Sequence, residues 1–118
     1  MEMKLNSAYL CVKAMDRAIN FYEAFLGQTV DIRDEILSIF DFKGFRLCLF
    51  CNEKVNEEVT YGDNCLLSFQ VEDMKELQKK LDALQAEIVF PLTKIGDNLV
   101  LEFKDTENND IEVYCREL

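Results

Sequence analysis

The segment DTENNDIEVYC, at residues 105–115, places a carboxylate where it could do chemistry. Its polar and apolar residues alternate, as they do in a β-strand, whose side chains point to opposite faces in turn. Glu112 and Tyr114 are therefore predicted to lie on one face and Ile111 on the other. A glutamate that projects from a strand could be a metal ligand, a general base, or a carboxylate that stays paired or solvated in a groove. Its residue type leaves all three roles open.

Cysteines are the second group with reactive side chains: Cys11, Cys48, Cys51, Cys65 and Cys115. An odd number at scattered spacings indicates free thiols in a reducing compartment rather than a disulfide framework. The C-x-x-C spacing of CLFC could serve a redox pair or half a zinc site, but two side chains at this spacing on a strand face opposite sides. We therefore interpret them as small apolar residues in a sheet. A nucleophilic Cys11 or Cys48 would need an activating base or cation, and without histidine only Arg46 or a lysine remains.

Charge and length limit the classes of partner. The 118 residues carry a formal net charge of -10, which repels phosphate backbones and anionic lipid, so neither nucleic acid nor a membrane is an expected partner. No apolar run approaches about 18 residues, the length of a spanning helix, and the N-terminal MEMKLNSAYL lacks the apolar stretch of a secretory signal. We expect a soluble, cytoplasmic protein with a single domain, residues 1–118.

The elements that must position these residues are arranged as a repeat. Residues 12–15 correspond to residues 71–74, at an offset of half the chain. In both copies a strand precedes this motif and an amphipathic helix follows it: NSAYLCV and MDRAINFYEAFL in the first, CLLSFQV and MKELQKKLDALQ in the second. Each helix has one apolar stripe, so each is predicted to pack on one side of a sheet.

The start and end signals of the two helices differ. Asp73 followed by Glu76 matches a capping box, whereas the first copy has Ala14 at the corresponding position, a loss that typically costs about 1 kcal/mol. Gly27 can adopt the left-handed conformation that ends the first helix.

Three strands are predicted after each helix, because the apolar period changes from 3.6 to 2: QTVDI, EILSIFDF and FRLCLF, then EIVF, DNLVLEF and NDIEVYC. The predicted fold is therefore α+β, with two βαβββ modules, each a curved mixed sheet flanked by one helix. Module 1 covers about residues 1–52, a polar linker about 53–63, and module 2 about 64–118. One helix cannot cover both faces of a four-stranded sheet, so the uncovered faces are predicted to enclose a groove.

The side chains on these uncovered faces are the candidate site. Strand alternation selects them, and the set is too polar for a sealed core. The predicted ligand-binding residues are Ser7, Tyr9, Arg46, Cys48, Phe50, Ser68, Gln70, Glu112 and Tyr114. Cys11 and Leu66 are assigned to the same faces.

Two motifs in the chain resemble those of a known family. One is V-x-x-M-D-R-A-x-x-F-Y-x-x-x-L-G at residues 12–27, and the other is D-x-x-x-N-x-I-E-V at residues 105–113. With the order of the modules, they are similar to the vicinal oxygen chelate superfamily, which includes glyoxalases, extradiol dioxygenases and bleomycin- and fosfomycin-resistance proteins. The final turn departs from the D-P-D-G-N usual in that family, with Thr106 for Pro and Asn108 for Gly. Asn nevertheless tolerates the left-handed conformation that a tight turn needs.

The resemblance implies four ligand positions around one divalent metal ion, often two His and two carboxylates. They fall at Ser7, Cys48, Leu66 and Glu112. Only Glu112 is a conventional oxygen ligand, Leu66 cannot coordinate a metal, and the chain contains no His. Zinc sites need three or more protein ligands, most often His or Cys, which Cys48 and Glu112 together do not supply. We therefore predict no metal and no other cofactor.

The leading hypothesis is a metal-free protein that binds a small organic molecule, by sequestration as in the bleomycin-resistance proteins that it resembles. Glu112 and Arg46 would bind opposite ends of a polar ligand, and Tyr9, Phe50 and Tyr114 would supply flat apolar walls. Two alternatives stay open: a metal-dependent lyase or dioxygenase of the same superfamily with an atypical site around Glu112, and a protein-interaction module with a vestigial groove. The chain resembles dimeric members in size, so a homodimer is expected. The sequence does not determine the ligand, or whether the protein is an enzyme.

Overall fold

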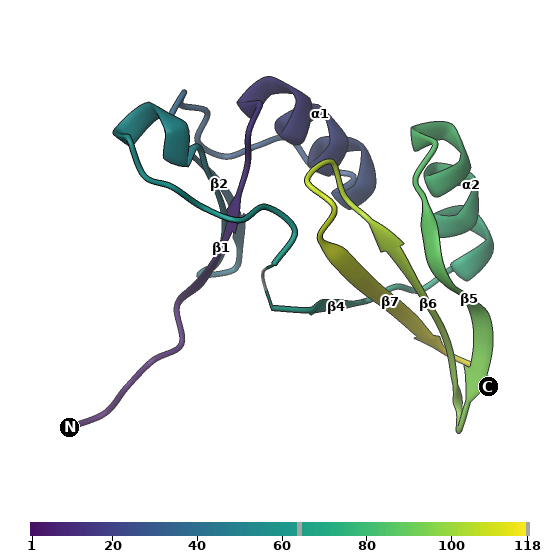
Figure 1. The fold of residues 1–118 in the computed structure, drawn as a ribbon. Coiled ribbons are helices and arrows are strands. Elements are labelled where there is room, and N and C mark those ends of the chain that lie inside the picture. The colour runs from purple at the N-terminus through teal and green to yellow at the C-terminus, as the bar shows by residue number, and fades with distance from the viewer. Residues whose placement is uncertain (64, 118) are drawn as a thin grey trace. The chain divides into compact units, whose positions relative to one another are not determined.

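The chain folds into two compact units that divide between Tyr61 and Gly62. The computed structural model describes residues 1–63 and 65–117, so positions 64 and 118, which bound the second predicted module, lie outside the described part. Each unit contains one helix of three turns and one mixed sheet (Figure 1). The fold is therefore α+β, as predicted from the repeat.

The first unit is built on a three-stranded sheet. Its elements are β1 (Ser7–Cys11), α1 (Met15–Leu26), β2 (Leu37–Phe42), β3 (Phe45–Phe50) and a short 3-10 helix, η1 (Asn52–Val55). The strand order is β1-β3-β2, with β1 parallel and β2 antiparallel to the central β3. The sheet is thus mixed, and its two outer strands both pair with β3.

One predicted strand of this unit is wrong. Residues 28–32 form only an isolated bridge, between Ile32 and Ile39, instead of a fourth strand. The backbone N–H of Val30 donates to the Glu23 carboxylate of α1 at 2.9 Å, so it is not available to a regular ladder. The alternating pattern of this short segment gives no sign that the Glu23 carboxylate competes with a neighbouring strand for the Val30 N–H.

Aromatic and aliphatic side chains of α1 form the core of the first unit against the sheet. Tyr22 and Ile19 are fully buried, and the Tyr22 ring lies 6.5 Å from the ring of Phe40 on β2. Leu47 and Leu49 of β3 are buried as well. Burying a side chain of this size contributes roughly 1.5–3 kcal/mol, so this one face of the sheet holds much of the stability of the unit.

The caps of the two helices follow the sequence prediction. Asp73 accepts a hydrogen bond from the backbone N–H of Glu76 at 3.1 Å, whereas Ala14 caps α1 with no side-chain bond. Gly27 takes the left-handed conformation, with φ at 68°. The second helix ends at Gln85, also left-handed, which is a costlier residue for that role.

The second unit is built on a four-stranded sheet. Its elements are β4 (Leu67–Gln70), α2 (Met74–Leu84), β5 (Ile88–Ile95), β6 (Asn98–Lys104) and β7 (Asp110–Arg116). The strand order is β4-β7-β6-β5, with β4 and β7 parallel and the other pairs antiparallel. Strand β5 is therefore an edge strand, and its pairing with β6 shifts register twice, between Ile88 and Phe90 and between Phe90 and Thr93.

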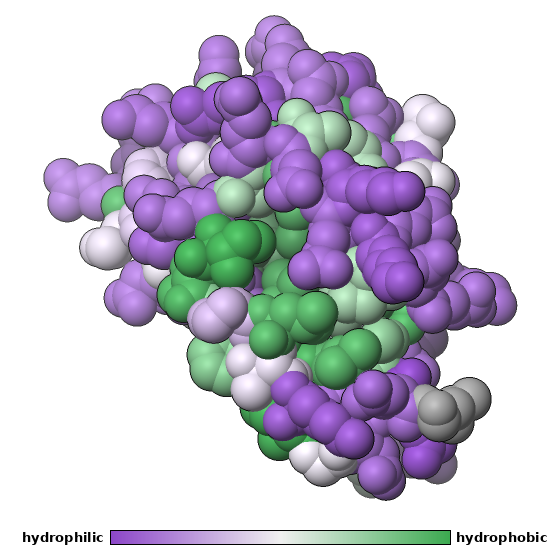
Figure 2. Space-filling model, turned by 90° about the vertical axis from the view of Figure 1, so that its right-hand side faces the viewer, coloured by the Kyte–Doolittle hydropathy of each residue, from purple (hydrophilic) through white to green (hydrophobic). Residues whose placement is uncertain are grey.

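One face of this sheet carries the core of the second unit. Ile111, Val113 and Phe103 are fully buried there, and α2 adds the buried Leu77 and Leu81. The edge strand is covered less well: Figure 2 looks onto the side of the molecule where β5 and α2 lie, and hydrophobic side chains reach the surface in a band among hydrophilic ones.

Neither helix among the described residues has the length and apolar character that a membrane crossing would require.

Candidate functional site

The turn that leads into β7 determines where Glu112 is placed. Asp105 Oδ1 accepts hydrogen bonds from the backbone N–H groups of Glu107 and Asn109, at 2.8 and 2.9 Å. Asp105 Oδ2 accepts another from Asn109 Nδ2 at 2.9 Å. Asn108 has a φ of 65°, the left-handed conformation predicted for it. The buried Asp105 carboxylate therefore organises the turn, in which Thr106 and Asn108 stand where the related motif has Pro and Gly.

Four predicted site residues lie together on the face of the second sheet that points away from the buried core. The parallel register of β4 and β7 pairs Ser68 with Glu112 and Gln70 with Tyr114. Ser68 Oγ donates to Glu112 Oε1 at 2.5 Å. The sequence prediction therefore assigned these side chains to one face correctly, and the structure makes Ser68 the direct partner of Glu112.

A second glutamate on this face was missed by the sequence analysis. Glu102 of β6 lies directly opposite Glu112 across the antiparallel pair. Like charges opposite each other on neighbouring strands are unfavourable, so this end of the face favours a cation or hydrogen-bond donors. Alternation along β6 could have placed Glu102 on the polar face, but its pairing with Glu112 follows only from the register.

A hollow of about 510 Å³ lies on the second unit, and two of the predicted residues line it. Its lining residues are Gln70, Ile95, Gly96, Asp97, Asn98, Tyr114 and Arg116. The volume is within the range of small-molecule sites, roughly 300–1,000 Å³. Arg116 was also missed, although it follows Tyr114 by two residues and alternation would place it on the same face.

A smaller hollow, of about 300 Å³, involves the glutamate that faces Glu112. It is lined by Gly62, Leu66, Glu102, Lys104, Asn108 and Asp110. Leu66 lies outside β4, which begins at Leu67, and its side chain is 51% exposed. The face of the second sheet thus carries Arg116 in the larger of these two hollows and Glu102 in the smaller one. The Ser68–Glu112 pair lies on the same face, on β4 and β7.

The first sheet brings the other five predicted residues together on its own second face. The register of β1 and β3 pairs Ser7 with Arg46, Tyr9 with Cys48, and Cys11 with Phe50. The Tyr9 ring is half exposed and packs edge to face on Phe50, with ring centroids 6.2 Å apart. A partly exposed aromatic pair of this kind can supply apolar contacts to a ligand.

Two thiols on this first sheet are poor nucleophiles. Burial raises the pKa of the Cys48 thiol, and a hydrogen bond with Tyr9 and the charge of Arg46 oppose that shift only in part. Burial also raises the pKa of Cys11, against a hydrogen bond with Asn52. Since both thiols are protonated near neutral pH, neither is activated for nucleophilic chemistry.

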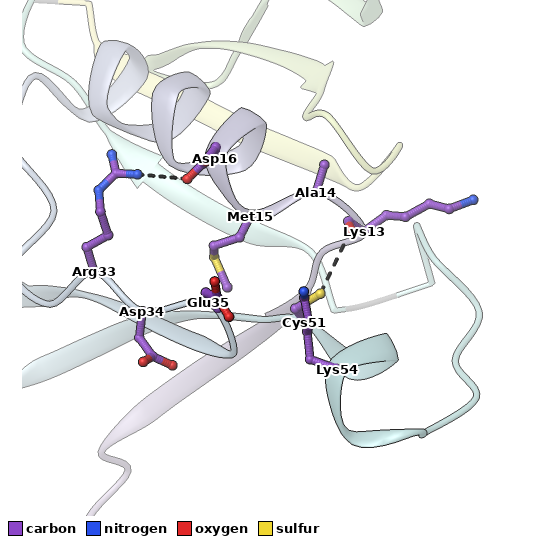
Figure 3. A pocket seen from close by; sticks show the side chains of 9 residues that line it. All are labelled: Lys13, Ala14, Met15, Asp16, Arg33, Asp34, Glu35, Cys51 and Lys54. Atoms are coloured by element: carbon purple, nitrogen blue, oxygen red, sulfur yellow. Dashed lines mark hydrogen bonds and ion pairs between the residues drawn. The ribbon is translucent and has the colours of Figure 1, made fainter.

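A hollow of about 650 Å³ that no sequence pattern predicted lies in the first unit. Figure 3 shows the side chains that line it, beside the start of α1. Its lining residues are Lys13, Ala14, Met15, Asp16, Arg33, Asp34, Glu35, Cys51 and Lys54. Arg33 pairs with Asp16 at 2.9 Å, and the Cys51 thiol donates to the Lys13 carbonyl at 3.8 Å. The side chain of Lys13 points away from the other lining residues. None of the nine predicted residues lines this hollow.

The residues at the implied metal-ligand positions do not suit a metal ion. Ser7 and Cys48 belong to the first unit, and Leu66 and Glu112 to the second. Cys48 is only 2% exposed, Leu66 has an aliphatic side chain, and Glu112 already accepts a hydrogen bond from Ser68. Within residues 1–63 and 65–117, no three His, Cys, Asp or Glu side chains cluster as a metal site would require.

Comparisons with known proteins agree with the sequence motifs. The model of the Glyoxalase/Bleomycin resistance protein/Dioxygenase superfamily matches residues 4–113. A search of curated proteins gives no significant match. Many solved structures share the fold.

Three of these structures illustrate the similarity. A glyoxalase-related enzyme from Fulvimarina pelagi is 16% identical, with a TM-score of 0.82 over 98% of this chain and 89% of its own. A lactoylglutathione lyase from Agrobacterium tumefaciens is 16% identical, with a TM-score of 0.75 over 98% and 95%. A glyoxalase/bleomycin resistance protein/dioxygenase from Nocardioides is 16% identical, with a TM-score of 0.75 over 98% and 85%. At this level of identity the similarity establishes the fold alone. The chemistry of this protein has to be inferred from the residues of its own site.

Proposed function

The chain belongs to the Glyoxalase/Bleomycin resistance protein/Dioxygenase superfamily, and on that premise we propose that it binds a small organic molecule without using a metal ion. The observation that carries the proposal is the hollow of about 510 Å³ on the second unit, lined by Gln70, Tyr114 and Arg116 among others. It combines an aromatic ring, amide groups and a guanidinium around a space of ligand size. Sequestration, rather than turnover, is the role that these groups support.

The charges on this face suggest the shape of the ligand. Arg116 offers a planar fork of donors that suits a carboxylate or another planar acceptor. Glu112 lies four residues away on the same strand, and Glu102 faces it across the sheet. Four residues of a β-strand span about 13 Å. We therefore propose an elongated ligand with an acceptor group near Arg116, a donor or cationic group near Glu112, and a flat apolar middle against Tyr114.

The donor chemistry supports binding over metal-assisted catalysis. The four positions that resemble metal ligands supply one carboxylate, one buried thiol, one hydroxyl and one aliphatic side chain. Divalent ions need several oxygen or nitrogen ligands, and a single carboxylate with water holds them weakly. The groups that remain on the face bind and orient a ligand but provide no activated nucleophile or identified acid–base pair.

The exposed aromatic pair on the first unit is a further proposed contact surface. Tyr9 and Phe50 form an edge-to-face aromatic pair, with Ser7 and Arg46 as polar neighbours on the same face. Arg46 and Glu112 remain the proposed polar contacts of the first and second units respectively. Each unit can therefore be tested with its own variants.

Thermal-shift and calorimetric screening tests the proposal with three matched sets of aromatic compounds: amino acid-like zwitterions, carboxylates and amines, together with bleomycin. A ligand present at about 100 times its Kd should raise the melting temperature by roughly 10 °C. Zwitterions should bind best. Tyr114→Leu and Arg116→Ala should weaken binding by about 10-fold or more, since each removes a central contact.

Two controls make this result specific. Arg33→Ala removes an arginine that pairs with Asp16 on the first unit, and it should leave affinity unchanged. Glu112→Gln should weaken the amines and zwitterions but spare the carboxylates, because it removes only the negative charge. Binding that disappears with a chelator and returns with a divalent ion would instead support the metal-dependent alternative. Unchanged affinity in Tyr114→Leu and Arg116→Ala would reject this site.

A further inference from the structure

Two opposite charges line the hollow of about 510 Å³ on the second unit: the carboxylate of Asp97 and the guanidinium of Arg116. Asp97 lies in the turn between β5 and β6, and Arg116 is the last residue of β7. Among the residues that the structure describes, neither side chain forms a hydrogen bond or an ion pair. Both groups can therefore bind a ligand.

The turn that carries Asp97 is fixed to the end of β7. The Asp97 carbonyl accepts a hydrogen bond from the backbone N–H of Glu117 at 2.8 Å, so this turn lies beside the C-terminal end of β7 (Figure 1). Arg116 faces Asn98 across the antiparallel β6–β7 pair, and facing residues in such a pair have Cβ atoms about 5 Å apart. Because Asn98 follows Asp97 in the chain, the register brings the guanidinium and the carboxylate to one end of the hollow.

Two further charges beside this turn are paired with each other. Lys94 Nζ lies 3.4 Å from Glu117 Oε2, and neither residue lines the hollow. The lining therefore carries one positive and one negative group, whose charges cancel. Its neutral polar side chains are those of Gln70, Asn98 and Tyr114. Such a lining is complementary to a ligand group that is itself zwitterionic.

An α-amino acid group has this character, because it carries a carboxylate and an ammonium on the same carbon atom. Arg116 suits the carboxylate, since its planar guanidinium can donate two parallel hydrogen bonds. Asp97 suits the ammonium, which has three donors and no acceptor. The attraction between two exposed charges contributes little free energy, so a ligand can bind between Arg116 and Asp97 at small cost.

From these observations we propose that the hollow recognises an α-amino acid group and that Asp97 determines this specificity. The inference rests on the proposed function, in which the ligand passes over Tyr114 and presents a donor or a cation to Glu112. The two charges of an α-amino acid group share one carbon, so they cannot reach Arg116 and Glu112 together. The ligand is therefore an aromatic α-amino acid with a second cationic or donor group at the far end of its side chain.

Isothermal titration calorimetry with two matched compounds tests the proposal. One is para-(aminomethyl)-L-phenylalanine, and the other is the phenylpropionate with the same ring, carboxylate and para-aminomethyl group but no α-ammonium. The wild type should bind the amino acid about 10-fold more tightly, as expected for one added hydrogen bond between charged groups. Asp97→Asn should remove most of this preference and leave the affinity for the phenylpropionate unchanged, which also shows that the variant is folded.

Two further variants separate this inference from the proposed function. Glu112→Gln should weaken both compounds equally and keep the preference, because both carry the far ammonium. Asp82→Asn makes the same change as Asp97→Asn at an exposed position on α2, outside the lining of the hollow, and should alter neither affinity.

Three results would overturn the assignment of Asp97. If the wild type binds the two compounds equally, or if Asp97→Asn weakens both to the same extent, the hollow does not recognise the α-ammonium through Asp97, and the proposed function still stands. If neither compound binds, the proposed function fails together with the inference.

Discussion

The N-caps of the two repeated helices differ, so substituting them is predicted to change the stability in opposite directions in the two units. Ala14 has the extended backbone of an N-cap, with φ at -124° and ψ at 104°, and its carbonyl already accepts from the N–H of Ala18 at 3.0 Å. A serine there can accept a hydrogen bond from the backbone N–H of Arg17 without a change of backbone. Ala14→Ser should therefore stabilise the fold, whereas Asp73→Ala should destabilise it.

The magnitude follows from the bond that each variant gains or loses. Asp73 Oδ1 accepts from the Glu76 N–H at 3.1 Å, and losing such a cap costs about 1 kcal/mol. For a chain of 118 residues this corresponds to a fall of roughly 4 °C in melting temperature, and Ala14→Ser should give a rise of similar size. The caps lie in different units and share no partner, so the double variant should melt close to the wild type.

Thermal and urea unfolding followed by circular dichroism measures these changes. Ala24→Ser is the matched control, because it makes the same substitution at an exposed position inside α1, where serine is the poorer helix former and should lower stability by about 0.5 kcal/mol. The reasoning fails if Ala14→Ser leaves the midpoint unchanged or lowers it while Asp73→Ala lowers it as expected. That result would mean that the first N–H groups of α1 are already satisfied.

The remaining predictions concern one glycine and the thiols. Gly62→Ala should destabilise the protein by more than about 2 kcal/mol, because φ is +80° and the new Cβ would lie 2.9 Å from the Glu107 carbonyl oxygen. Gly96→Ala should cost only about 1 kcal/mol, because φ is +59° and the space around the new Cβ is open. Equal urea midpoints for the two variants would contradict this. Alkylation at pH 8 followed by mass spectrometry should modify the exposed Cys65 well before the buried Cys48, and simultaneous modification would show that Cys48 is accessible. The raised pKa of Cys48 adds stability that is fully present below its ordinary value of 9.0 and is lost as the pH rises through the folded value. The urea midpoint should therefore fall above pH 9 by more in the wild type than in Cys48→Ala.

The local pattern of the sequence was sufficient to predict those helices and strands that depend on interactions between residues close together in the chain. The α1 bounds Met15–Leu26 and the β3 bounds Phe45–Phe50 match the prediction, and α2 ends one residue earlier than predicted. The apolar spacing of a helix, the Asp73 cap and the left-handed Gly27 are properties of a few consecutive residues. The assignment of Glu112 and Tyr114 to one face follows from strand alternation in the same way.

Tertiary structure decided the features that depend on residues far apart in the chain. The register of β6 against β7 placed Glu102 opposite Glu112, and the parallel pairing of β4 with β7 gave Glu112 its Ser68 partner. The carboxylate of Glu23 took the Val30 N–H and left only a bridge where a strand was predicted. These outcomes could not be read from spacing, because a hydrogen bond between distant segments depends on which groups the whole fold brings together, and several residues in the chain can compete for each one.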